Sequence, residues 1–166
     1  VPALLAFALV ILVPFLQSMR LSLYKYTIDM ERPAFVGLAN FTRLLADPGT
    51  ATIWVNTLVF VVLTTGLTFV LGLGWALMMN QSFKGRAVVR AASLLPWVLP
   101  TTVTAFLAAW IFNGQYGVLN ALLLQAGLID QPVTWLAEEK GAMAAVILTK
   151  AWLSVPLFMA FFLAGL

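Results

Sequence analysis

The sequence predicts an all-α polytopic membrane protein with about four transmembrane helices. Of its 166 residues, 63% are hydrophobic and only 9% are charged, and the mean hydropathy is +1.02. A soluble domain is usually about half apolar, and a chain of this size could not hide so much apolar surface from water. The apolar residues also form continuous runs instead of the alternating segments of about ten residues that barrel strands show, which favours helices.

Four apolar segments are long enough to cross a bilayer, which takes about 20 helical residues. They cover residues 2–19, 56–79, 88–112 and 141–166. Because the chain begins at Val1 and stops at Leu166, inside apolar runs at both ends, we expect it to be a piece of a longer protein. No small-residue cleavage pattern follows the first segment, which favours a retained membrane helix over a signal peptide.

The links between these segments differ in length and charge. In the long link 20–53, apolar residues at helical spacing predict a short surface helix that ends at Asp47-Pro48. The link 80–87 is tight and basic. The link 113–140 should hold an amphipathic helix over residues 117–128, and its far end is acidic at Glu138 and Glu139.

Basic residues in the tight link predict which side of the membrane it faces. Lys84, Arg86 and Arg90 lie there without a nearby acid, which is typical of a cytoplasmic loop. A raw count opposes this orientation, since five cations lie on the other side: Arg20, Lys25, Arg32, Arg43 and Lys140. The density of charge favours the tight link as cytoplasmic, and the two long links then face outward.

The composition also excludes several kinds of chemistry. The chain has no cysteine and no histidine, so thiolate nucleophiles, imidazole bases and thiolate or imidazole metal ligands are missing, and we expect no metal site and no cofactor. The net charge of +3 rests on few groups and does not predict nucleic-acid binding.

No predicted span has an acidic residue at its centre, which argues against an ion-coupled transporter, although backbone groups could bind sodium. The phosphate-binding loop of ATPases is also missing, so any active transport must draw its energy from a partner.

Packing and kinking residues are concentrated in the later segments. From residue 101 onward, small residues recur every four positions, and Ala105 and Ala109 are expected to let this helix approach a neighbour closely. Pro96 and Pro100 should bend or break the same segment, and Pro156 should kink the last one. Irregular backbone at membrane depth is tolerated where it is buried or lines a cavity. The third segment is therefore either a kinked packing helix or part of a polar pathway.

Five side chains are candidates for a solute path. Thr101 and Thr104, with their neighbour Thr102, could face such a path or bond carbonyl groups freed by the prolines. Lys150 is either a pathway charge or a side chain that extends to the outer interface. Trp97 and Trp152 lie deep in their segments, where flat aromatic faces could contact a sugar, although packing would also explain them.

Several short patterns occur in a fixed order along the chain. They are Phe35-Val36-Gly37-Leu38-Ala39-Asn40-Phe41, Leu44-Leu45-Ala46-Asp47, Asn56-Thr57-Leu58, Phe83-Lys84-Gly85-Arg86, Leu95-Pro96, Trp110-Ile111-Phe112-Asn113, Gly117-Val118-Leu119-Asn120 and Ala164-Gly165-Leu166. In this order the chain resembles the membrane permease of a binding-protein-dependent ABC sugar importer. It is most similar to the first permease of the maltose, trehalose and glycerol-phosphate type pairs.

The resemblance implies a transport subunit that is not itself an enzyme. Its expected partners are a second homologous permease, a cytoplasmic ATPase dimer, an extracytoplasmic solute-binding protein and the lipid bilayer of a bacterial or archaeal cytoplasmic membrane. Residues 1–52 would form a first helix with an outer loop, and residues 53–166 an incomplete transmembrane domain. The ATPase-coupling loop of the family would follow Leu166. Two alternatives stay open: a permease for a non-sugar solute, or a structural membrane protein without a solute path.

Overall fold

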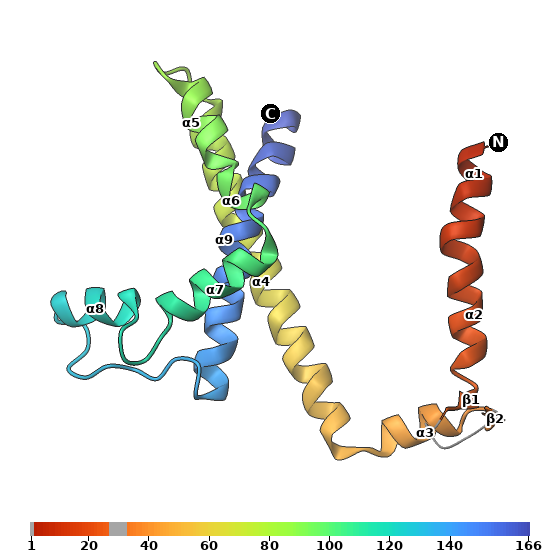
Figure 1. Ribbon diagram of the computed structural model, residues 1–166. Helices are drawn as coiled ribbons and strands as arrows, with labels where there is room; N and C mark the ends of the chain where they lie inside the picture. Colours follow the sequence, from red (N-terminus) through yellow and green to blue (C-terminus); the bar gives the residue numbers. More distant parts are fainter. Residues whose placement is uncertain (1, 27–32) are drawn as a thin grey trace. The chain divides into compact units, whose positions relative to one another are not determined.

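The computed structural model describes residues 2–26 and 33–166 (Figure 1). Arg32, one of the cations counted above, lies outside the described residues. The helices are α1 (Pro2–Phe7), the π-helical η1 (Ala8–Leu12), α2 (Val13–Leu21), α3 (Ala39–Ala46), α4 (Pro48–Asn80), α5 (Arg86–Ser93), α6 (Leu95–Val98), α7 (Thr101–Ile111), α8 (Val118–Gln125) and α9 (Glu139–Gly165). The strands are β1 (Tyr24–Lys25) and β2 (Ala34–Phe35).

The predicted spans are present among the described residues, but one of them is broken. Three continuous helical stretches are long and apolar enough to cross a membrane: Pro2–Leu21, Pro48–Asn80 and Glu139–Gly165. A fourth span requires the pair Arg86–Val98 and Thr101–Ile111, whose two parts meet at a bend of 90°. The prediction of an all-α protein with about four spans is confirmed, with the third span broken instead of continuous.

Two compact units make up the chain, Val1–Asn56 and Thr57–Leu166. This boundary lies close to the predicted division between residues 52 and 53. The domain roles assigned to the two parts stay a prediction.

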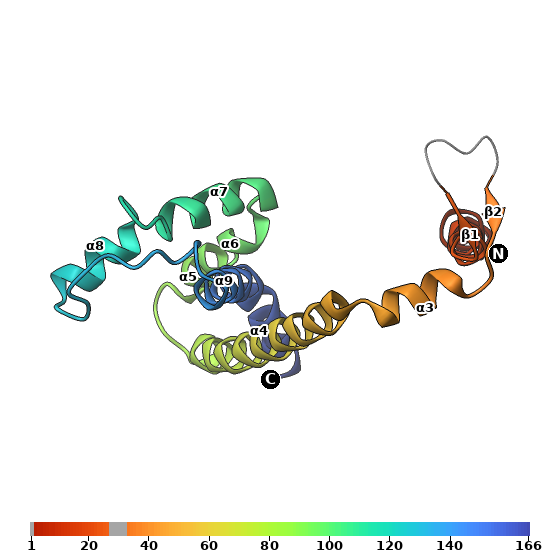
Figure 2. The same ribbon diagram turned by 90° about the horizontal axis from the view of Figure 1, so that it is seen from below.

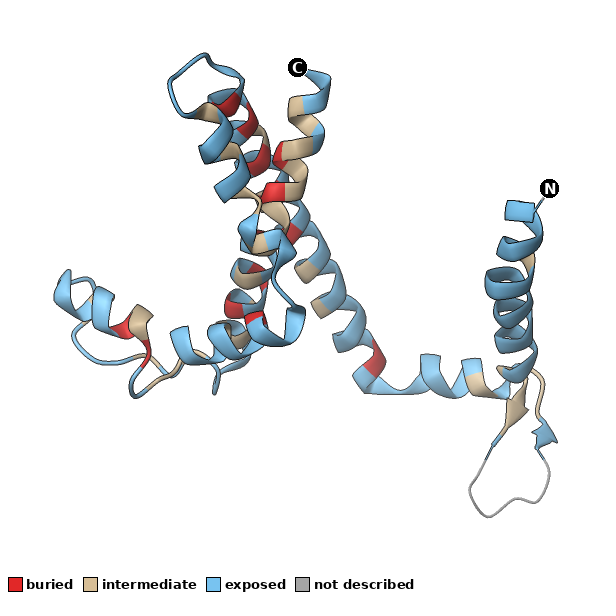
Figure 3. Ribbon diagram, turned by 45° about the horizontal axis from the view of Figure 1, so that its top comes forward, coloured by how far each residue is buried: buried red, intermediate tan, exposed pale blue. Residues whose placement is uncertain are grey.

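The first unit begins with a helix that is exposed over its whole length (Figure 3). Its π-helical turn lies directly before Pro14, which has no N–H for the carbonyl of Val10 and crowds that carbonyl with its ring. The N–H of Val13 bonds the carbonyl of Ala8 instead, so the helix widens for one turn. A helix that is apolar all round suits a lipid environment.

A hairpin and a surface helix follow in the same unit. β1 and β2 pair antiparallel with Tyr24 opposite Phe35, and the two rings meet edge to face at 5.3 Å. The predicted surface helix is confirmed as α3. It ends at Ala46, and Asp47 follows as its C-cap, with Oδ1 accepting a hydrogen bond from Gly49 N at 2.9 Å. α4 then begins at Pro48, well before the expected start at residue 56, because proline suits the first turn of a helix.

Close packing between α4 and α9 forms the core of the second unit (Figure 3). The buried face of α4 consists of Thr64, Thr68, Gly72, Ala76 and Met79. A Cβ at Gly72 would lie only 2.7 Å from the Cβ of Phe158, so the backbone of α4 lies directly against α9. Phe69 and Phe162 add an edge-to-face contact at 5.1 Å. Small residues allow this approach in lipid, where packing replaces the hydrophobic effect between helices.

Candidate functional site

The break in the third span lies at Leu99 and Pro100. Leu99 is extended with ψ of 135°, the conformation that a following proline imposes, and Pro100 is extended as well with ψ of 136°. α7 begins directly afterwards and turns away from α5 and α6 (Figures 1 and 2). Pro96 lies in the first turn of α6, where a missing N–H costs nothing, whereas Pro156 lies inside the continuous α9.

The basic link between α4 and α5 closes the end of α4. Arg90 Nη2 donates a hydrogen bond to the carbonyl of Met79 at 2.6 Å, and Arg86 Nη1 donates to the carbonyls of Asn80 and Gln81 at 3.3 and 3.4 Å. Cationic side chains are favourable here because the last carbonyls of a helix carry partial negative charge. Two of the three predicted cytoplasmic cations therefore have a structural role, while Lys84 is exposed.

A hollow of about 330 Å³, which we call the α7–α9 hollow, brings together three of the five path candidates and both predicted packing alanines. Its lining is mainly apolar and consists of Thr101, Thr104, Ala105, Ala108, Ala109, Phe112, Leu136, Ala145, Val146, Thr149, Lys150 and Leu153. Thr104 is buried and its hydroxyl donates to the carbonyl of Pro100 at 3.2 Å, which also accepts the helical hydrogen bond from Thr104 N. This carbonyl is not one that a proline frees, so the role predicted for the threonine stays a prediction. Ala105 and Ala109 border the same hollow. α7 and α9 therefore face each other across a hollow at these residues, and their roles in packing or in a path stay predictions.

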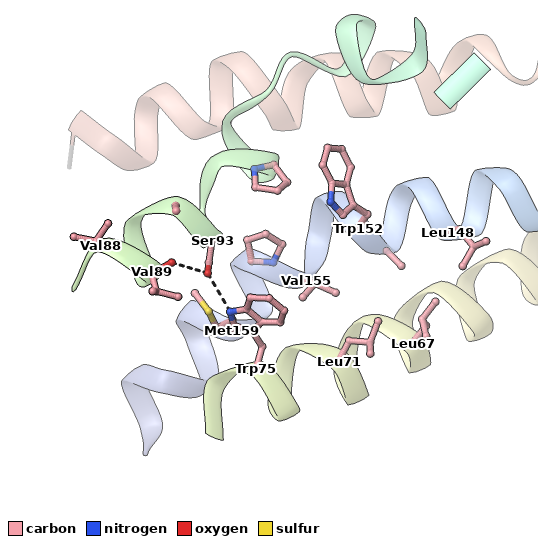
Figure 4. A pocket seen from close by; sticks show the side chains of 14 residues that line it. Leu67, Leu71, Trp75, Val88, Val89, Ser93, Leu148, Trp152, Val155 and Met159 are labelled. Atoms are coloured by element: carbon pink, nitrogen blue, oxygen red, sulfur yellow. Dashed lines mark hydrogen bonds between the residues drawn. The ribbon is translucent and has the colours of Figure 1, made fainter. Parts of the chain in front are cut away.

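The other predicted residues lie elsewhere in the second unit. Trp152, Pro96 and Pro156 line a second depression of about 740 Å³, which we call the apolar groove (Figure 4). The groove is lined from α4 by Leu67, Leu71 and Trp75, from α5 and α6 by Val88, Val89, Ala92, Ser93 and Pro96, and from α9 by Leu148, Ala151, Trp152, Val155, Pro156 and Met159. Trp97 lines neither depression, and 52% of its surface is exposed. The five path candidates therefore do not converge on one point.

Sequence reasoning missed the role of Asn120 in the link between α7 and α9. This side chain is buried and makes four hydrogen bonds: Nδ2 donates to the carbonyls of Gly114 and Val133 at 3.1 and 2.9 Å, and Oδ1 accepts from Val133 N and Trp135 Nε1 at 3.2 and 2.8 Å. It thereby ties the two ends of the link together.

Asn40 has a similar position at the start of α3. Its Nδ2 donates to the carbonyls of Ser22 and Tyr24 at 2.8 and 3.0 Å, so it holds the hairpin to the helix. Both asparagines stand three residues after a glycine, at 37–40 and 117–120. At Gly117, an added Cβ would collide with the carbonyl oxygens of Asn113 and Ile111. This repeated Gly-x-x-Asn spacing is the sequence signal that could have revealed both hydrogen-bonding asparagines.

The missed packing face of α4 also has a sequence signal. Small residues recur there every four positions, at Thr64, Thr68, Gly72 and Ala76, as they do from residue 101 onward.

Together these features define a helical membrane protein in which a broken span borders depressions between long spans. Such backbone breaks are typical of membrane proteins that move solutes.

Known proteins of this class are similar to the chain in sequence, although no family model matches it. The chain is 32% identical over 168 residues to the trehalose/maltose transport system permease protein MalF of Thermococcus litoralis, a match that covers 99% of this chain and 55% of that protein. It is 31% identical over 167 residues to the sulfoquinovosyl glycerol transport system permease protein SmoG of Agrobacterium fabrum, with 99% and 53% covered.

A solved structure shares the fold. It is a bacterial ABC transporter involved in the import of the acidic polysaccharide alginate, with a TM-score of 0.79 and 21% identity over 99% of this chain and 54% of that one. The chain is therefore similar over almost its whole length to permease proteins of ABC transporters, the resemblance that its motifs indicated. It spans about half the length of the curated relatives it matches.

Proposed function

We propose that this chain forms part of the membrane pathway of an ATP-driven importer that takes up a carbohydrate across the cytoplasmic membrane. The observation that carries the proposal is the sequence similarity over 99% of the chain to permeases of two sugar transport systems. The fold supports the proposal. The chain, with its broken third span and its long helices α4 and α9, superimposes on an ABC importer chain with a TM-score of 0.79.

The proposed assembly supplies what this chain lacks. A second permease would complete the pathway, a cytoplasmic ATPase dimer would hydrolyse ATP, and this chain would carry no catalysis of its own. An extracytoplasmic binding protein would deliver the solute; one similar solved structure is an alginate transporter in complex with an alginate pentasaccharide-bound periplasmic protein. The links 20–53 and 113–140, which Asn40 and Asn120 hold by hydrogen bonds, would form the docking surfaces for the binding protein. A fixed loop backbone loses little entropy when a partner binds it.

Within the chain, we propose that the α7–α9 hollow borders the solute path. Thr101, Thr104 and Lys150 all line it, and it lies beside the break at Pro100. Trp97 and Trp152 lie outside this hollow, and their proposed part is to offer aromatic faces at other points of the path. In the same proposal, residues 53–166 form the transmembrane domain, and residues 1–52 form the preceding helix with an outer loop.

The test is uptake of labelled maltose or trehalose by the full transporter reconstituted in liposomes with its binding protein. We expect uptake that requires ATP on the ATPase side. Uptake that continues in vesicles without the ATPase subunit would contradict the proposal. If the binding protein captures no sugar but binds another solute class, the permease is a non-sugar importer.

Filling the hollow tests the path itself. Ala105→Trp should reduce uptake at least about tenfold, because an indole blocks the hollow, while Val103→Trp, on the same helix but outside the hollow, should not. Co-purification of the ATPase subunit reports assembly for both variants. Unchanged uptake with Ala105→Trp in an intact complex would contradict a solute path at this face.

A further inference from the structure

The apolar groove between α4, α5 and α9 has the chemistry of a hydrocarbon site. Its lining is hydrocarbon apart from Ser93 and the indole N–H groups of Trp75 and Trp152. Two of these polar groups are already paired, since Trp75 Nε1 donates to Ser93 Oγ at 3.1 Å and Ser93 Oγ donates to the carbonyl of Val89 at 2.7 Å (Figure 4). A sugar would lose hydrogen bonds to water here without replacement, whereas an alkyl chain would not.

The dimensions of the groove match one leaflet of a bilayer. Along α9 its lining runs from Leu148 to Met159, which is about 17 Å at the helical rise of 1.5 Å per residue. The hydrocarbon core of a bilayer is about 30 Å thick, so one leaflet is about half of that. A single acyl chain therefore suits the length of the groove.

Positive charge lies at one end of the groove. Val88 and Val89 line the groove on α5, and Lys84, Arg86 and Arg90 lie on the same helix and the turn before it. No acidic residue occurs between positions 80 and 100, so these charges are not balanced locally. α5 is thus amphipathic, with two arginines four residues apart and valines in the groove, as helices at the surface of a membrane are.

We propose that the apolar groove holds an acyl chain of an anionic phospholipid, whose phosphate is bound by Lys84 and Arg86. Arg86 uses Nη1 for the end of α4, which leaves Nη2 for a phosphate, and Lys84 is exposed. Charge complementarity selects an anionic lipid over a zwitterionic one, because basic residues beside a membrane bind anionic headgroups. The inference is independent of which solute the transporter carries.

The experiment is native mass spectrometry of the full permease complex released from nanodiscs that contain equal amounts of phosphatidylglycerol and phosphatidylcholine. We expect phosphatidylglycerol to be retained in preference to phosphatidylcholine. Lys84→Gln should reduce this retention about fivefold, the effect expected for one cation near a membrane surface. Lys140→Gln, which removes a cation from a different link, is the matched control and should change nothing.

Filling the groove separates a specific site from general attraction to charge. Ala92→Trp places an indole in the groove and leaves every cation in place, so it should remove the retained lipid. Thermal unfolding in phosphatidylcholine nanodiscs checks that both variants fold. Equal retention of the two lipids, or retention unchanged by Lys84→Gln and by Ala92→Trp in folded protein, overturns the proposal. A groove that holds another subunit or a second copy, with no lipid detected, also overturns it.

Discussion

Gly72 is the residue at which α4 lies directly against α9. Its missing side chain lets the backbone meet Phe158, and Thr68 and Ala76 on either side are buried on the same face. Asn120 has the opposite role, because its full set of hydrogen bonds holds an outer link in one conformation. At the scale of single residues, Gly72 stabilises the protein by letting two helices pack closely. Asn120 stabilises it by using all of its side-chain hydrogen-bonding groups within one link.

Gly72→Leu should destabilise the protein by about 1–3 kcal/mol, because the added side chain must push α4 away from α9. The measurement is thermal unfolding of the purified protein in detergent. Gly66→Leu and Gly74→Leu are matched controls on the same helix, since nothing lies within 4 Å of a Cβ at either position. Equal loss of stability in all three variants would show that α4 and α9 are less closely packed than the structure indicates.

Asn120→Leu should loosen the link between α7 and α9. The substitution leaves the N–H of Val133, the carbonyls of Gly114 and Val133 and the indole of Trp135 without this partner. These groups are half-buried, so the loss of each hydrogen bond should cost about 0.5–1.5 kcal/mol. Hydrogen exchange at the Val133 amide should accelerate at least about tenfold. Gln125→Leu, an exposed change on the same helix, should leave exchange unaltered. Protection of Val133 that survives Asn120→Leu would mean that the link is held by other contacts.

Among the elements, the broken third span differs most from a simple membrane helix. Pro100 lacks a backbone donor and holds Leu99 in an extended conformation, whereas Pro96 lies in the first turn of α6, where its missing N–H costs nothing. The chain responds by ending one helix at Val98 and starting another at Thr101. Because α7 then borders α9, the break at Pro100 creates the hollow to which the candidate path residues contribute.

Replacing both prolines should restore a continuous helix. In the double variant Pro96→Ala/Pro100→Ala, spin labels on cysteines at Ala87 and Ile111 should move apart toward about 36 Å, the length of 24 residues of straight helix. The chain has no native cysteine, so the label pair is unambiguous. Pro156→Ala serves as the control, because α9 is already continuous at that position. A distance that does not lengthen would assign the break to tertiary packing instead of the prolines.

For the whole molecule, we predict the orientation in the membrane from the dense positive charge of the tight link. Lys84 and Arg86 should retain this link on the cytoplasmic side, since basic loops are translocated poorly. The two long links, 20–53 and 113–140, would then face outward. The same orientation would place the proposed anionic lipid in the cytoplasmic leaflet.

Cysteine accessibility tests this orientation. A membrane-impermeant maleimide should label Asp130→Cys in intact cells and should label Lys84→Cys only after the membrane is opened. Both positions are exposed, so accessibility within the protein does not limit the reaction. The reverse pattern would show that the raw number of cations, and not their density, governs insertion.

Much of the architecture could be predicted because membrane spans are a local property of the chain. Continuous apolar runs predicted the spans, and helical spacing predicted α3 and α8 to within a few residues. Pro100 predicted a bend or break, because a missing N–H acts on its own helix. The early start of α4 was missed, because polar and apolar residues mix in its first turns and show no clear helical period.

The sequence by itself determined the fold class, the approximate number of spans and the resemblance to ABC permeases, because each depends on composition, periodicity or the order of motifs. Only the tertiary structure decided which side chains meet. It brought Thr101, Thr104 and Lys150 to one hollow, separated Trp152 from them, and revealed that Arg86 and Arg90 close a helix end. The physical reason is that such contacts depend on how two helices are rotated against each other, and that rotation is set by packing partners far away in the chain.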